Sequence, residues 1–174
     1  MLITNLGRTR IRLLASFGTL TDEQLNTKYY PCEWTVSQIV HHLYIVEKNI
    51  ATDVLSALGG TSEKVAEKDL SYLRTDDSLL HIELESHSGF MTKQELIRML
   101  EESRFRYLQR VFNETHERIL VDKSTAHPLF GKISLKNLVD CVWLHEQYHT
   151  IQIENMSASF KDVVDSTDIS NVAL

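Results

Sequence analysis

Two histidines, His145 and His149, have the spacing in this sequence that most clearly suggests chemistry. They lie four residues apart in the strongly helical segment LKNLVDCVWLHEQYHTIQIENM, so both rings should project from one helix face. Two imidazoles side by side in a core are costly unless partners satisfy their nitrogen atoms. A shared divalent metal ion would do so, because such ions favour imidazole nitrogen ligands. The alternative interpretation is a pair of core histidines held by hydrogen bonds.

A third ligand is available upstream, where His41 and His42 are adjacent and therefore about 100° apart on a helix. His42 shares the apolar face of Ile39 and Val46, whereas His41 lies toward the rim. We therefore expect His42 to be the ligand and His41 to lie behind the ligands or at the surface. Three histidines leave coordination positions open for water or substrate, which is usual for a catalytic site rather than a closed structural one.

Four further side chains are candidates for supporting roles. Glu47, Glu146 and His41 are the visible general-base candidates if the ion activates water. Glu47 and Gln152 could each orient a ligand through a hydrogen bond, and Gln152, one turn past the second histidine of the pair, is the better placed. Cys141, one turn before the first, could approach the metal or a substrate, although packing is the ordinary role of a small buried cysteine.

The string HEQYH at residues 145–149 also matches the H-E-x-x-H motif of zinc proteases, with Glu146 as general base. That motif needs its structural setting as well as its letters. No histidine follows His149 to supply a third ligand, and no strand-rich half precedes the helix. The sequence context therefore disfavours a protease.

Helix-start signals place the elements that would carry these residues. Three capping boxes, each a threonine answered three residues later by Gln or Glu, begin at Thr21, Thr35 and Thr92, and Ser134 is a fourth candidate cap. The patterns predict helices over about 2–18, 22–25, 35–58, 92–113 and 134–158. We expect a long crossover over 59–91 with a short helix near 63–70, and a simple turn at AHPLFGKIS.

These elements predict an all-α protein, an up-and-down four-helix bundle with a long crossover between its second and third helices. With 6 Gly and 2 Pro in 174 residues, long uninterrupted helices are plausible and a sandwich or barrel of tight turns is disfavoured. No repeat or linker divides the chain. We expect one domain over 1–174, with the bundle in 1–158 and a polar tail in 159–174.

Charge and composition narrow the function classes. The formal net charge of -6 disfavours binding to a phosphate backbone. The densest basic group is Arg104, Arg106 and Arg110. Within it Arg106 and Arg110, one turn apart, are better explained as a solvated helix face than as a phosphate site. Two cysteines make no disulfide framework, and neither a convincing signal peptide nor a membrane-spanning stretch is present. We expect a cytoplasmic protein with a small-molecule substrate and no nucleic-acid or membrane partner.

Two segments, EWTVSQIVHHLYIVE and HPLFGKISLKNLVDCVWLHEQYHTIQIE, together carry a family resemblance. In the first, His-Leu stands at the eighth and ninth positions after Trp34, with Glu47 behind. In the second, a glycine-containing turn precedes H-x-x-x-H-x-x-Q-I. On these motifs the sequence resembles the DinB/YfiT-like superfamily of metal-binding four-helix bundles. The resemblance selects the same ligands, His42, His145 and His149.

The resemblance implies one zinc, nickel or similar ion, with manganese as a further possibility, and frequent homodimers. It also implies thiol chemistry, because characterised relatives include S-transferases that use low-molecular-weight thiols such as bacillithiol. Three functions stay open from the sequence. The first is a thiol-dependent S-transferase acting on small electrophiles, and the second is a hydrolase using metal-activated water. The third is a non-enzymatic metal-binding dimeric module.

Overall fold

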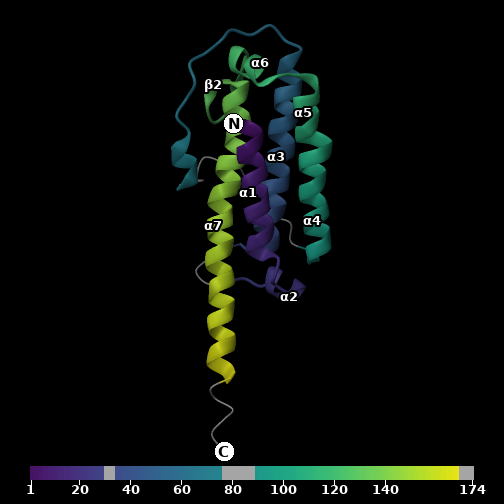
Figure 1. Cartoon of the computed structure of the whole chain (residues 1–174), viewed down its shortest axis with the longest axis vertical. Helices are drawn as coiled ribbons and strands as arrows, with labels where there is room; N and C mark the ends of the chain where they lie inside the picture. The colour runs from purple at the N-terminus through teal and green to yellow at the C-terminus, as the bar shows by residue number, and fades with distance from the viewer. Residues whose placement is uncertain (30–33, 76–88, 169–174) are drawn as a thin grey trace, which may run out of the picture.

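The computed structural model describes residues 1–29, 34–75 and 89–168, with side chains placed as far as residue 159 (Figure 1). Its α-helices are α1 (Leu2–Phe17), α2 (Asp22–Leu25), α3 (Val36–Leu58), α4 (Lys93–Glu101), α5 (Gln109–Glu114), α6 (Glu117–Asp122) and α7 (Leu135–Asp168). The remaining elements are the 3₁₀ helix η1 (Ser71–Arg74), the π-helix η2 (Glu102–Leu108) and the strands β1 (Ser124–His127) and β2 (Gly131–Ser134). Among the residues described, no helix combines the length and apolarity needed to cross a membrane.

The capping boxes are confirmed at the start of α2, α3 and α4. At each of these starts a threonine side chain accepts a hydrogen bond from the backbone N–H three residues on, and the Gln or Glu at that position bonds back to the threonine N–H. Ser134 caps α7 in the same sense, because its Oγ accepts from the Asn137 N–H at 3.1 Å. Local sequence therefore determines where these helices begin.

The four-helix bundle is confirmed, with α1, α3, the continuous α4–η2–α5 rod and α7 as its members (Figure 1). Successive contacts between α1 and α7 join later residues of both helices, first Thr9 to Glu146 and then Arg12 to Glu154, so these helices are parallel. The rod and α3 both begin beside α2, where Asn26 bonds to Ser37 and to Met91, so they are parallel too. The long connection after α3 therefore returns the chain to the end of the bundle at which α3 began.

Two buried apolar clusters fill the bundle. One joins the C-terminal half of α3 to the first half of α7 and includes Val54, Leu138 and Cys141. The other joins the end of α1 to the start of α3 and to α4 and includes Phe17 and Ile39. The histidine and ionic side chains described below lie on the helices that form these clusters.

Two sequence predictions in the connections are wrong, and one short helix was not predicted. Residues 63–70 form no helix, because both the N–H and the C=O of Lys68 bond to the Asn137 side chain on α7 instead of to a helical turn. The segment AHPLFGKIS is a β-hairpin rather than a simple turn, pairing Ser124–Ser134 through His127–Gly131. Gly131 adopts a φ of 65°, which disfavours other residues there. The short helix α6 was not predicted.

Two predictions about helix interiors and ends are also corrected. The 92–113 helix is present, but its residues 102–108 form a π-helical stretch, and Phe105, an apolar residue in that stretch, is 70% exposed. The last helix does not end at Ala158 but continues to Asp168, past the other helices (Figure 1). The residues beyond Ala158 are polar, yet they contain neither Gly nor Pro, so nothing local stops the helix.

Candidate metal centre

The three predicted ligand histidines meet inside the bundle. His42 comes from α3, and His145 and His149 come from successive turns of α7. Their Nε2 atoms are close: 3.1 Å from His42 to His145 and 2.9 Å from His145 to His149. All three side chains are at most 3% exposed. Among the residues described, these three are the group of histidine, cysteine and acidic side chains that could hold an ion, with ligand atoms within 4.8 Å of one another.

The donor set fits a divalent metal ion. Two nitrogens held about 2.0–2.1 Å from one tetrahedral zinc lie roughly 3.4 Å apart, close to the separations observed here. Neutral imidazole is also the ligand type that zinc and nickel prefer. Small side-chain adjustments would therefore bring the three Nε2 atoms onto one ion.

A hydrogen bond orients one of the ligands. His149 Nδ1 lies 2.8 Å from Gln152 Oε1. Because an amide oxygen only accepts, the proton belongs on Nδ1 and the lone pair on Nε2 is directed at the other two histidines. Gln152 therefore has the orienting contact that its position on α7 predicted.

Aromatic rings surround the ligands. Trp34 meets His42 edge-on at 5.1 Å between ring centroids, and Tyr148 meets His149 at 5.1 Å. His41 is directed elsewhere, against Tyr44 with centroids 6.3 Å apart, and is not part of the three-histidine group. The structure thus separates the adjacent histidines as helix geometry predicts.

The two carboxylates among the general-base candidates lie in a buried ionic ring. Glu47 accepts hydrogen bonds from Arg10, Arg104 and the Ser103 hydroxyl, the last at 2.8 Å. Glu146 accepts from the same two arginines and from Thr9 Oγ1 at 2.6 Å. Both carboxylates are only 2% exposed, and each of their oxygens already has a donor. A carboxylate whose two oxygens are already engaged by arginine and hydroxyl donors is poorly placed to remove a proton from water.

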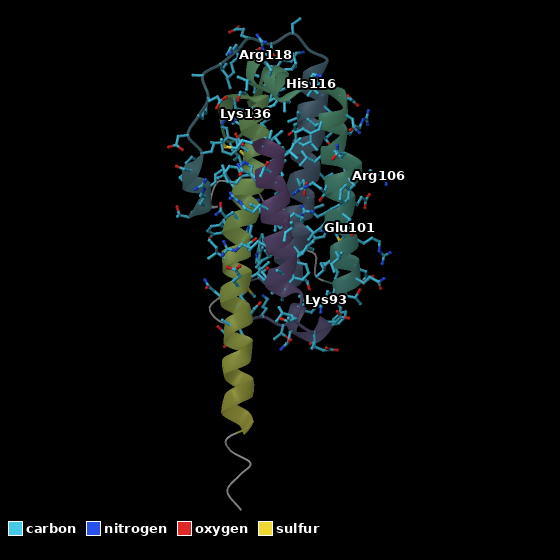
Figure 2. The ribbon with its side chains drawn as sticks, in the orientation of Figure 1. Lys93, Glu101, Arg106, His116, Arg118 and Lys136 are labelled. Carbon is cyan, nitrogen blue, oxygen red and sulfur yellow. The ribbon has the colours of Figure 1, made fainter. Side chains whose placement is uncertain are left out.

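Neither Arg10 nor Arg104 was predicted from the sequence to face the bundle interior. Arg104 is instead 11% exposed and faces the bundle interior. Arg106 and Arg110 do lie on the outer face, each paired with a glutamate one turn on, and Figure 2 shows Arg106 on the side away from α1 and α7. The sequence does contain a signal for an inward-facing arginine, because Arg10 lies between Leu6 and Leu13 on the apolar face of a helix.

Cys141 is fully buried in the apolar cluster of α3 and α7. Burial, with a smaller contribution from the nearby Asp140 charge, raises the pKa of its thiol to about 12. The side chain therefore stays protonated at neutral pH, and its contacts are those of a packing residue.

A family model and individual known proteins match this chain. The model of the DinB superfamily matches residues 5–153, which include all three histidines. The chain belongs to the DinB superfamily. The match covers most of the bundle and both motif segments of the sequence.

Individual relatives are more distant. A protein of Oceanobacillus iheyensis, named as a candidate metal-dependent hydrolase, is 27% identical over 144 residues, covering 82% of this chain and 76% of its own. The solved structure of YfiT from Bacillus subtilis superposes with a TM-score of 0.66 at 21% identity and covers 92% of this chain and 86% of that one. YfiT is described as a candidate metal-dependent hydrolase with an unusual four-helix bundle topology. At this identity the likeness to YfiT shows the fold of this DinB-superfamily chain.

Proposed function

We propose that this DinB-superfamily chain is a metal-dependent enzyme that joins a low-molecular-weight thiol, such as bacillithiol, to a small electrophile. His42, His145 and His149 would hold one divalent ion, zinc or nickel in preference to manganese because all three donors are nitrogen. When bound, the ion supplies a Lewis acid that keeps a thiol sulfur deprotonated near neutral pH.

One observation carries the choice of thiol transfer over hydrolysis. The two carboxylates that could serve as a base for water, Glu47 and Glu146, are both ion-paired to arginines. A thiol is far more acidic than water and loses its proton to solvent without a dedicated base. The thiolate sulfur then forms a bond to the electrophilic carbon, and the leaving group departs with its bonding electron pair.

The protein's own side chains would position the reactants. Gln152 holds the His149 ring with Nε2 inward. Trp34 and Tyr148 are half-buried rings against two of the ligands, and they offer an apolar surface for the carbon skeleton of the electrophile. The buried Cys141 is not used as the nucleophile in this proposal, because its thiol remains protonated.

Hydrolysis is the second candidate, supported by the names of the O. iheyensis and B. subtilis proteins. The two reactions differ in their need for a thiol. The metal-loaded chain, purified without a histidine tag, would be assayed against a panel of electrophilic and ester substrates with and without bacillithiol.

Thiol-dependent conjugation that is lost in His145→Ala, together with its bound metal, would support transfer. Product formation that is unchanged when the thiol is omitted would support hydrolysis and contradict transfer. Stoichiometric metal in the absence of turnover across the panel would favour the third possibility, a metal-binding module that is not an enzyme.

A further inference from the structure

A closed ring of charged side chains lies beside the histidines. Its members, which we call the ionic clamp, are Arg10, Glu47, Arg104 and Glu146. Each comes from a different member of the bundle, and each arginine contacts both carboxylates. The clamp therefore links all four members of the bundle at one level, and its two positive and two negative formal charges cancel.

The clamp sits next to the ligands in the chain. Glu146 directly follows His145 on α7, and Glu47 lies five residues after His42 on α3. The carboxylates thus belong to the two helices that carry the histidines, whereas the arginines belong to the two that do not. Because one guanidinium spans both carboxylates, its width sets the distance between α3 and α7 at this level.

Other contacts fix the arginines in turn. Arg104 also donates to the Leu6 carbonyl at 2.7 Å, and Arg10 donates to the Leu100 carbonyl. The π-helix η2 places the adjacent residues Ser103 and Arg104 on the same carboxylate, that of Glu47. π-helical turns are frequent at functional sites.

General stability is a weak reason for burying these charges. Desolvation makes buried ion pairs about as stabilising as well-packed apolar residues, or less so. Burial by itself lowers the pKa of Arg10, but Glu146 and Glu47 outweigh it and leave that pKa above its usual value. The clamp therefore remains charged, and geometric precision is the property that it offers.

We propose that the ionic clamp positions the metal centre: it holds α3 against α7 at the separation at which His42 reaches His145 and His149. Its members are positioning residues and touch no reacting atom. The proposal rests on the metal centre proposed above and assigns to Glu47 and Glu146 a role other than general base.

The test uses Arg10→Lys, which keeps the charge but cannot span two carboxylates. Arg12→Lys is a matched control, because Arg12 lies on the same helix and also forms a two-bond pair with a glutamate of α7, Glu154, at the surface. Cobalt(II) is titrated into each untagged, metal-free protein against a competing chelator. The visible absorption spectrum then reports the coordination geometry.

We expect Arg10→Lys to bind cobalt about 10–100-fold more weakly with altered visible bands, the effect typical of residues that support metal ligands. Arg12→Lys should match the parent in both respects. Parent-like affinity and spectrum in Arg10→Lys, even with a lower melting temperature, would overturn the proposal.

Two further variants keep the test decisive if Arg10→Lys does not fold. Glu146→Gln keeps the side-chain size without the charge, and Ser103→Ala removes one donor from Glu47. Each should weaken cobalt binding, Ser103→Ala by a smaller factor, and parent-like binding in both would overturn the clamp. A parent chain that binds no cobalt would instead overturn the metal centre itself.

Discussion

At the residue scale, the contact between His149 and Gln152 shows how a ligand is prepared for an ion. The amide oxygen fixes the proton on Nδ1, so that Nε2 faces the other histidines. Without this contact the ring can rotate or change tautomer. Metal binding is then weaker, because restoring the orientation with Nε2 toward the other histidines costs free energy.

Gln152→Leu is therefore expected to weaken zinc binding about 10–100-fold while the helix content is retained. The measurement is a competition titration with a fluorescent chelator. Gln109→Leu on the exposed face of α5 is the control, because Gln109 bonds only to Asn113 among the described contacts. Equal zinc affinity in the Gln152 variant and the control would contradict the orienting role.

The thiol of Cys141 gives a second prediction at this scale. Its pKa is raised from 9.0 to about 12, so that at pH 8 about one thiol in ten thousand is ionised. In a Cys32→Ser background, the native protein should react with a thiol reagent orders of magnitude more slowly than the urea-unfolded chain. Rapid native labelling would show that Cys141 is accessible to solvent.

At the element scale, local signals start the helices and long-range contacts shape their interiors. The α4–η2–α5 rod begins with a capping box, yet its middle turns are π-helical where Ser103 and Arg104 reach Glu47. Within this stretch the charged Arg104 lies inward and the apolar Phe105 lies outward.

Thr35→Ala should lower the free energy of unfolding by about 1 kcal/mol, because it removes the side-chain acceptor at the start of α3. Urea denaturation followed by circular dichroism measures the change. Thr52→Ala is matched to it on the same helix, since the contact of Thr52 among the described residues is a hydrogen bond back to the Lys48 carbonyl on an exposed face. The control should differ from the parent by less than about 0.5 kcal/mol.

At the scale of the whole molecule, an ion held by residues from α3 and α7 would link distant parts of the chain. A ligand that binds only the folded state adds stability, about 2.7 kcal/mol at a free concentration 100 times its dissociation constant. For a chain of this size that corresponds to a rise in melting temperature of roughly 5–10 °C.

Chelation of the metal-loaded protein should accordingly lower its melting temperature by a similar amount, as measured by differential scanning calorimetry. His145→Ala is the comparison, because it should melt at the same temperature with and without chelator. A parent chain whose melting temperature is unaffected by chelator and by added zinc would contradict a metal site formed on folding.

The sequence by itself determined the features that depend on neighbours within a turn or two of helix. These are the capped helix starts at Thr21, Thr35 and Thr92, the common face of His145 and His149, and the inward direction of His42 beside His41.

Tertiary structure decided the role of the charged residues. From the sequence, Glu47 and Glu146 are candidates for a general base. Their partners Arg10 and Arg104 come from other helices, and only the packing of the bundle buries these two positive and two negative charges together. The same packing joins residues of the π-helix η2 to Glu47 and joins Lys68 to Asn137. No local sequence pattern relates the residues that meet in these contacts.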